Sequence, residues 1–442
     1  MTWHEHAIFW HVYPLGFVGA EPVLDDGAPV QHRLGRLVDW LDYAVDLGVS
    51  GLLLGPVFTA RSHGYDTIDH LTVDPRLGDR SDFETLVAAA HARGLKVVLD
   101  GVFNHVGRDH PLFRAAVTGG PAAPEAELFH LSWPAGGAVN PAPGAPAEPE
   151  YRTFEGHAGL VALNHDAPAV VALVTEVMNH WLDAGADGWR LDAAYAVPPA
   201  FWAQVLPEVR ARHPEVYVVG EVIHGDYAAV VADSGMDSVT QYELWKAIWS
   251  ALNDHNLYEL AHALGRHDAM VEAFAPQTFV GNHDVTRIAT RLTDRRHLPH
   301  ALVVLLTVAG TPAVYYGDEQ AMTGLKEERL GGDDAIRPAY PAAPADLPAE
   351  GWATYHLHQE LIGLRRRHPW LHRSRLRVLH LANELLAYEQ SAGAERVVVV
   401  LNLADDAAQV PAAGAGRVLA GSAEVLADGV RVPGHGWAVL GG

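Results

Sequence analysis

The 442-residue sequence contains no cysteine, which excludes a disulfide framework and thiol catalysis. No stretch approaches the run of about 18 apolar residues that a transmembrane helix needs. The first residues, Met-Thr-Trp-His-Glu-His-Ala, lack the basic segment and the apolar segment of a signal peptide. From these absences we expect a cytoplasmic protein that does not cross a membrane.

Basic residues are also scarce. The chain has 31 lysines and arginines against 54 acidic residues, a formal net charge of −23. Such a charge disfavours nucleic acid and anionic membranes as partners. It suits a neutral, hydroxyl-rich ligand, although solubility alone is a sufficient reason for it. Hydrophobic residues make up 49% of the chain, enough for a sizeable core.

Strand and helix patterns alternate over roughly the first 365 residues. The expected helices include residues 34–47, 81–93, 168–184 and 298–310, and Ser81 is expected to cap the second of them. The expected strands are residues 8–13, 51–54, 96–99, 188–191, 217–220, 236–240, 278–281 and 313–316. Eight such pairs predict a closed (β/α)8 TIM barrel, in the α/β class.

Two segments depart from the alternation. Residues 107–151 are rich in proline, glycine and alanine, which predicts a loop domain inserted after the third strand. Short strands separated by turn residues follow residue 369, which predicts an antiparallel β-domain. The expected domains are the catalytic barrel at 1–105 and 165–368, the inserted domain at 106–164 and the C-terminal β-domain at 369–442.

Carboxylates follow the apolar strands at the point where each strand ends. Asp192, Glu221 and Asp284 come after three of them, and Asp100 ends a fourth. Acidic residues just past the C-terminal ends of barrel strands are typical of a (β/α)8 active site. Retaining glycoside hydrolysis needs one carboxylate that attacks the anomeric carbon and one carboxylic acid that protonates the leaving oxygen.

The segments around these carboxylates resemble the four ordered motifs of the α-amylase family of glycoside hydrolases. The segments are Asp-Gly-Val-Phe-Asn-His at 100–105, Gly-Trp-Arg-Leu-Asp at 188–192, Gly-Glu-Val-Ile at 220–223 and Phe-Val-Gly-Asn-His-Asp at 279–284. Residues 63–78 and 311–319 resemble two further landmarks of that family. The resemblance spans at least residues 8 to 340, and six motifs in the right order make coincidence very improbable.

The resemblance implies catalytic roles for the three carboxylates. Asp192 is then the nucleophile, Glu221 the general acid and later the general base, and Asp284 the third carboxylate, which holds sugar hydroxyls. Arg190 lies two residues before Asp192 on one strand, so both side chains face the same way. We expect its guanidinium to keep Asp192 ionised by lowering the pKa of that carboxyl.

The resemblance also implies a set of substrate-binding residues. Those residues are Tyr65, stacked beneath the sugar in the cleavage subsite, His105 and His283, bound to its hydroxyls, and Asp334 and Arg337, forming a wall. Asp100 is expected to position the loop that carries Asn104 and His105. Three loop aromatics, Trp133, Phe154 and Tyr195, are candidates for acceptor sites. The alternative for each single residue is structural: an ion pair at the barrel mouth or a packing aromatic.

Asn104 resembles a residue that binds calcium in many amylases. Calcium needs several more oxygen ligands, and the inserted segment does not reveal them. The Lys-His pair that follows the nucleophile in one common calcium-linked subsite is replaced here by Ala193-Ala194-Tyr195-Ala196. The expected cofactor is therefore none, with calcium at Asn104 as the alternative.

Two details favour the intracellular cyclomaltodextrinase, neopullulanase and α-glucosidase-like branches: residues 163–166 and residues 315–324 with Arg337-Pro338. The expected function is retaining hydrolysis of α-glucosidic bonds, α-1,4 above all, in malto-oligosaccharides or related α-glucosides. Transglycosylation, sugar phosphorolysis or isomerisation on the same scaffold is one alternative. A catalytically inactive binding subunit is another, and the oligomeric state is left open.

Overall fold

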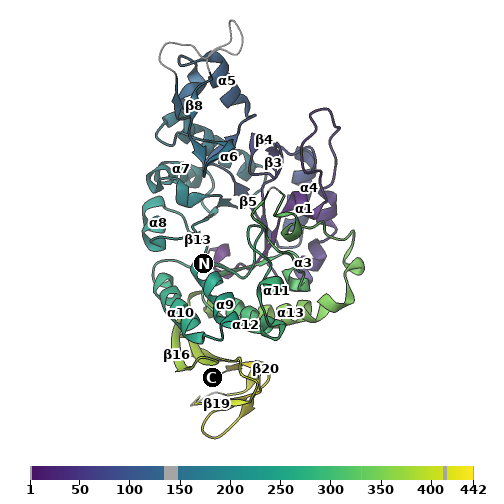
Figure 1. The fold of residues 1–442 in the computed structure, drawn as a ribbon, viewed down its shortest axis with the longest axis vertical. Coiled ribbons are helices and arrows are strands. Elements are labelled where there is room, and N and C mark those ends of the chain that lie inside the picture. The colour runs from purple at the N-terminus through teal and green to yellow at the C-terminus, as the bar shows by residue number, and fades with distance from the viewer. Residues whose placement is uncertain (1, 134–147, 330, 412–415, 442) are drawn as a thin grey trace.

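The centre of the molecule is a ring of eight parallel strands (Figure 1). The computed structural model describes residues 2–133, 148–329, 331–411 and 416–441. The strands, in spatial order, are β13 (Ser238–Val239), β12 (Tyr217–Gly220), β11 (Gly188–Leu191), β5 (Lys96–Gly101), β2 (Gly51–Leu54), β1 (Phe9–Val12), β15 (Thr311–Tyr315) and β14 (Gln277–Phe279). A parallel bridge between Thr240 and Gln277 joins the two outer strands. The predicted (β/α)8 barrel is confirmed.

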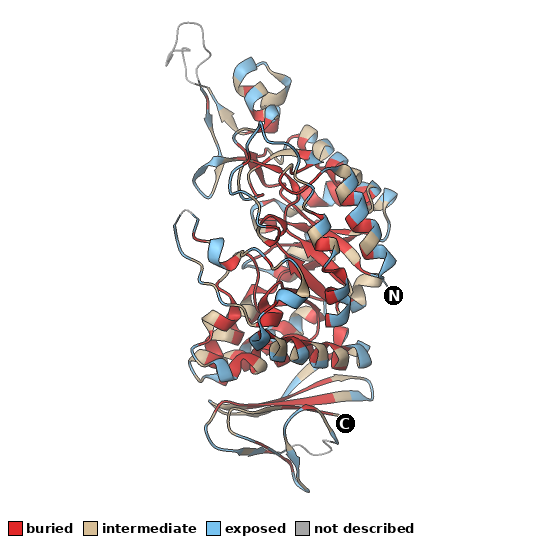
Figure 2. Ribbon diagram, turned by 90° about the vertical axis from the view of Figure 1, so that its right-hand side faces the viewer, coloured by how far each residue is buried: buried red, intermediate tan, exposed pale blue. Residues whose placement is uncertain are grey.

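These strands are apolar because both of their faces are covered. Every residue of β1, β2, β11, β12 and β15 is buried. Figure 2 shows the buried strands at the centre, inside helices whose outer faces are exposed. A parallel sheet covered on both faces reads as a continuous apolar run, so the carboxylates stand out where the strands end.

The helices that surround the ring follow the expected alternation. The longer ones are α4 (Arg80–Ala92), α6 (Pro168–Asp183), α7 (Pro199–Arg212), α8 (Tyr227–Ser234), α9 (Tyr242–Asn253), α10 (Leu257–Val271), α12 (Leu298–Thr307) and α13 (Trp352–Arg367). No helix in the described ranges is long and apolar enough to span a membrane.

Two details of the helix prediction were wrong. The helix expected over 34–47 is divided into α2 (Gly35–Val38) and α3 (Leu41–Leu47), with Asp39 and Trp40 between them. The ring of Trp40 is fully buried against those of Tyr43 and Tyr340, at centroid distances of 5.0 and 4.6 Å.

The N-terminal cap of α4 also differs from the expectation. Asp79, and not Ser81, caps the helix, since its carboxylate accepts hydrogen bonds from the backbone N–H groups of Ser81 and Asp82. Asp82 in turn accepts from the N–H of Asp79, which completes a capping box.

The segment after the third barrel strand forms its own small sheets at one end of the molecule (Figure 1). It contains β6 (His105–Gly107), α5 (Pro111–Gly119), β7 (Leu131–Ser132), β8 (Glu150–Tyr151), β9 (Thr153–Phe154) and β10 (His157–Ala162). Strand β10 pairs with both β6 and β9. Residues 134–147 lie outside the described residues, and the domain boundaries at 105/106, 164/165 and 368/369 stay predictions.

The C-terminal end is an antiparallel β-structure, as expected. One sheet contains β16 (Arg375–Leu381), β17 (Leu385–Ala392), β18 (Glu395–Asn402), β23 (Trp437–Gly441) and β20 (Val418–Gly421). A second sheet of β19 (Ala408–Val410), β22 (Val430–Val432) and β21 (Glu424–Val425) was missed, because strands of two or three residues carry too little alternation to be recognised. Helix α10 packs against β16 and joins this end to the barrel.

Candidate active site

Three carboxylates meet at the C-terminal ends of the barrel strands. Asp192 and Glu221 directly follow β11 and β12, which are neighbours in the ring, and Asp284 lies five residues after β14. All three line a single cavity of about 320 Å³, together with Tyr65 and His105. The barrel therefore brings together Tyr65 and Asp284, which are 219 positions apart in the chain.

Arg190 is the cation that lies among Asp100, Asp192 and Glu221. Its side chain is 3% exposed, and its Nη1 donates to both oxygens of Asp100, at 2.7 and 2.6 Å. Its Nη2 lies 2.8 Å from Oε1 of Glu221, whereas Oδ1 of Asp192 is 3.5 Å from Nη1. The guanidinium thus bridges the carboxylates, but its shortest contacts are with Asp100 and Glu221.

Arg190 lowers the pKa of Asp192, as expected, but its effect does not prevail. Burial, followed by the nearby charges of Glu221 and Asp100, raises the pKa of Asp192 well above its ordinary value, and Arg190 only opposes this in part. One cation cannot neutralise this many buried carboxylates, so the ligand-free site favours keeping a proton among them.

Glu221 is held by three donors. Besides Arg190, the backbone N–H of Ala193 donates to its Oε2 at 2.9 Å, and the hydroxyl of Tyr242 donates to its Oε1 at 3.0 Å. Ala193 has a φ of +46°, a conformation that an alanine rarely adopts. In this conformation its backbone N–H donates to Glu221. Asn282 donates from Nδ2 to the Tyr242 hydroxyl at 2.9 Å, so Tyr242 is fixed in turn.

Tyr242 was missed by the sequence analysis. It is the first residue of α9, just after β13, and lines the catalytic cavity. Its only signal in the sequence is its place after the sixth strand, and a two-residue strand gives that signal little weight.

Asp284 differs from Asp192 in its surroundings. Its Oδ2 is 2.9 Å from Nε2 of His283, and its Oδ1 is 3.0 Å from Nη2 of Arg337. Burial would raise the pKa of Asp284, but the interactions with His283 and Arg337 outweigh it and hold the pKa well below the ordinary value. Asp284 is therefore the carboxylate that stays ionised.

Tyr65 and His283 form a pair at the floor of the site. Their rings stack at a centroid distance of 5.3 Å, and the Tyr65 hydroxyl contacts Nε2 of His283. The same hydroxyl donates to Oδ2 of Asp100 at 3.0 Å. Nδ1 of His283 lies 3.2 Å from Nε2 of His11, a buried residue on β1 that the sequence analysis did not select. Asp100, the next-to-last residue of β5, therefore holds both Tyr65 and Arg190.

His105 is buried and already engaged in hydrogen bonds. Its Nε2 lies 3.0 Å from the carbonyl oxygen of Tyr65, its Nδ1 lies 3.1 Å from Nδ2 of Asn104, and its ring stacks on Phe154 at 4.7 Å. Burial lowers the pKa of His105 to about 4. The neutral ring then accepts from Asn104 at Nδ1 and donates from Nε2.

A calcium site at Asn104 stays a prediction. The cavity of about 270 Å³ beside Asn104 is lined by the carboxylates of Glu155 and Asp166 and also by Arg152, His130 and His165. Calcium prefers six to eight oxygen ligands, most of them carboxylate or carbonyl. Within the described ranges, no cluster of three histidine or acidic side chains close enough to share an ion includes these residues.

The structure places some of the remaining candidate binding residues at the site and others away from it. Arg337 reaches Asp284 and also pairs with Asp333 at 2.9 Å, whereas Asp334, the residue singled out in the sequence, is exposed. A binding role for Asp334 stays a prediction. Phe154 and Tyr195 line the catalytic cavity, but Trp133 is not among its lining residues.

Known proteins resemble this chain in sequence and in fold. The family model described as alpha amylase, catalytic domain, matches residues 33–346. A cyclomaltodextrinase of Geobacillus thermopakistaniensis (strain MAS1) is 31% identical over 433 residues, covering 92% of this chain and 71% of its own. An intracellular maltogenic amylase of Bacillus subtilis (strain 168) is 31% identical over 300 residues, covering 66% of this chain and 49% of its own. The solved structure of a cyclic α-maltosyl-(1→6)-maltose hydrolase of Arthrobacter globiformis superposes with a TM-score of 0.82 at 26% identity, over 100% of both chains.

Proposed function

This chain belongs to the α-amylase family of glycoside hydrolases, and we propose that it cleaves α-1,4-glucosidic bonds of malto-oligosaccharides or related α-glucosides. Within that family it is a glycosidase that acts on α-glucosidic bonds with retention at the anomeric carbon. The observation that carries the proposal is the single cavity lined by Asp192, Glu221 and Asp284.

In the proposed first step, Asp192 attacks the anomeric carbon while Glu221 gives its proton to the oxygen of the leaving sugar. The C–O bond to the leaving group breaks, and an ester bond to Asp192 forms. The step requires the proton of the crowded site to lie on Glu221. The three donors around Glu221, namely Arg190, Tyr242 and the N–H of Ala193, hold its carboxyl in one orientation for that transfer.

In the second step, Glu221 takes a proton from water, the water oxygen attacks the anomeric carbon, and Asp192 leaves as a carboxylate. The product keeps its α configuration because two displacements occur at one carbon. We assign Asp284 to the sugar hydroxyls, since an ionised carboxylate accepts strong hydrogen bonds from them. Tyr65 offers its ring face to the same sugar.

A product analysis tests the proposal. The protein is incubated with maltose, maltotriose and a cyclodextrin, with and without phosphate, and the products are resolved over time while NMR follows the anomer first released. We expect glucose or maltose, formed first as the α-anomer. A β-anomer as first product would contradict retention, and longer oligosaccharides or sugar phosphates would instead support the transferase or phosphorylase alternative.

A second candidate activity is cleavage of α-1,6 bonds. The Arthrobacter hydrolase named for a maltosyl-(1→6)-maltose ring matches this chain over its full length, whereas the cyclomaltodextrinase is longer. Panose, which contains one bond of each kind, discriminates between the two. Release of isomaltose and glucose shows cleavage at α-1,4, and release of maltose and glucose shows cleavage at α-1,6. No turnover of any substrate by folded protein would support the binding-subunit alternative.

Cytoplasmic residence is also part of the proposal. It is supported by the name of the Bacillus subtilis relative, an intracellular enzyme. Fractionation of the producing cells tests it: the protein is expected with the cytoplasmic fraction, and recovery from the medium would contradict it.

A further inference from the structure

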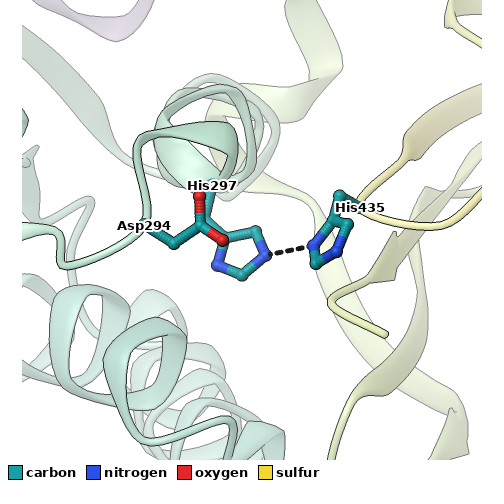
Figure 3. A group of neighbouring side chains, drawn as sticks. All are labelled: Asp294, His297 and His435. Atoms are coloured by element: carbon teal, nitrogen blue, oxygen red, sulfur yellow. Dashed lines mark hydrogen bonds between the residues drawn. The ribbon is translucent and has the colours of Figure 1, made fainter. Parts of the chain in front are cut away.

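A second cluster of ionisable side chains lies outside the catalytic cavity, where the barrel meets the C-terminal β-structure (Figure 3). Asp294 caps the short 3-10 helix Arg295–His297 that leads into α12, and His297 is the last residue of that helix. His435 lies on the turn between β22 and β23. One potential ligand atom from each of the three lies within 4.8 Å of the others.

The two histidines point their ring nitrogens at each other. Nε2 of His297 and Nδ1 of His435 are 3.0 Å apart (Figure 3). A zinc ion with tetrahedral ligands and Zn–N bonds of about 2.0–2.1 Å sets its nitrogens about 3.3 Å apart. The observed pair therefore needs to open by only about 0.3 Å to hold an ion between its lone pairs.

The far side of His435 is already arranged as in metal sites. Its Nε2 lies 2.7 Å from Oδ1 of Asp405, and metal-bound histidines commonly donate their second N–H to a carboxylate. The backbone of His435 has a φ of +50°, which is unusual for a residue other than glycine. The chain thus holds this ring in place at some cost in backbone energy.

Access differs among the three side chains. His297 is 1% exposed, whereas Asp294 and His435 are partly exposed, so an ion can enter from the solvent side and keep a water molecule as its fourth ligand.

Arg296 is the group that competes with an ion. Its Nη2 lies 2.6 Å from Oδ2 of Asp294, and its side chain is 60% exposed. Asp294 must release this contact in order to bind a cation. Nη1 of Arg296 lies 3.8 Å from Oδ1 of Asp405, so the guanidinium has a second carboxylate nearby.

We propose that Asp294, His297 and His435 form a binding site for a divalent transition-metal ion, with Zn²⁺ as the best match. Two imidazoles and one carboxylate are ligands that zinc accepts, and the site offers no soft sulfur ligand. Because the ligands come from the barrel and from the C-terminal sheet, the ion would link the two. The catalytic residues take no part in this site, so the inference stands apart from the proposed function.

The test uses tag-free protein stripped of metal with a chelator and then titrated with ZnCl₂. Calorimetry, metal analysis of the dialysed protein and thermal unfolding are measured together. We expect one zinc ion per chain and a higher Tm with zinc than without it. Absence of stoichiometric binding would overturn the proposal.

Three variants sharpen the test. His435→Asn removes a ligand but keeps a residue that tolerates the left-handed conformation, and it should weaken zinc binding at least tenfold. Arg296→Gln removes the competing cation and should strengthen binding. His32→Ala is the control, since His32, Asp79 and Asp82 form the other candidate group in the described residues. The proposal fails if His435→Asn binds zinc like the wild type, or if His32→Ala is the variant that abolishes stoichiometric binding.

Discussion

Two buried arginines, Arg190 and Arg287, differ in how many carboxylates they contact. Arg190 contacts three of them, Asp100, Asp192 and Glu221, beside an open cavity. Arg287 is completely buried and contacts a single carboxylate, Asp318, at 2.9 Å.

The rest of Arg287 is enclosed by backbone and rings. It donates to the carbonyl oxygens of Tyr316 and Ile336 at 2.9 and 3.0 Å, and its guanidinium lies over the Tyr315 ring at 4.6 Å. An arginine paired with one carboxylate in a closed environment is typical of structure. An excess of carboxylates over cations at the wall of a cavity is typical of catalysis.

A shifted pKa alone does not separate the two regions. Burial raises the pKa of Asp318 to about 7, although Arg287 pulls the other way, and burial also raises the pKa of Asp192. Only the geometry distinguishes them, because Asp192 lines the cavity whereas Asp318 is 1% exposed and does not line it. The following predictions test whether Arg190 and its carboxylates serve catalysis and whether Arg287 and Asp318 stabilise the fold.

The largest expected effect is that of Asp192→Asn on turnover. Removing the nucleophile should lower kcat by about 10⁴-fold or more. The free energy of unfolding should stay equal or rise, because one of several crowded acids is gone. Steady-state kinetics and urea unfolding of the same preparation measure both. A wild-type rate would remove Asp192 as the nucleophile.

The effect of Glu221→Gln on kcat should depend on how strongly the leaving group needs a proton. Loss of the general acid is expected to lower kcat by about 10²- to 10⁴-fold on maltotriose. The loss should be smaller on an aryl α-glucoside, whose phenolate leaves without a proton. Rates on the two substrates are compared, and equal losses on both would contradict the acid role.

Arg287→Leu should mainly lower the stability of the folded protein. Leaving Asp318 buried without its partner should lower the free energy of unfolding by about 3 kcal/mol. The kcat of the folded fraction should change far less than in Asp192→Asn. Urea unfolding measures the first quantity and active-site-normalised kinetics the second. Unchanged stability would show that Arg287 and Asp318 do not stabilise the fold as a pair.

A further expected effect is a pH dependence of the free energy of unfolding due to Asp318. Its pKa of about 7 in the folded protein exceeds its unfolded value of about 3.9. Its contribution to stability is therefore fully present below about pH 3.9 and is lost as the pH rises through 7. Asp318→Asn should gain stability relative to the wild type between pH 5 and pH 8. A relative loss over that interval would show that Arg287 keeps Asp318 ionised.

Much of the fold could be predicted because its signals are local. Apolar runs that end in Asp192 and Glu221 mark strands covered on both faces, and their alternation with helices is enough for a barrel. The pattern failed at Asp39 and Trp40, where the structure divides the expected helix, and Trp40 is buried against Tyr43 and Tyr340. It also failed for the short strands of the second C-terminal sheet.

The sequence predicted which residues form the candidate site better than it predicted the contacts among them. Motifs single out Asp192, Glu221, Asp284 and Arg190, which the structure brings to one cavity. They did not indicate that Arg190 contacts Asp100 most closely.

The sequence by itself determined the barrel, the acidic strand ends and the family, because each depends on residue types at short, regular spacings. Only the tertiary structure decided that the pKa of Asp192 is raised and that of Asp284 lowered, since pKa values depend on burial and on charges from distant segments. The same holds for His297 and His435, 138 positions apart, whose facing nitrogens no local pattern predicts.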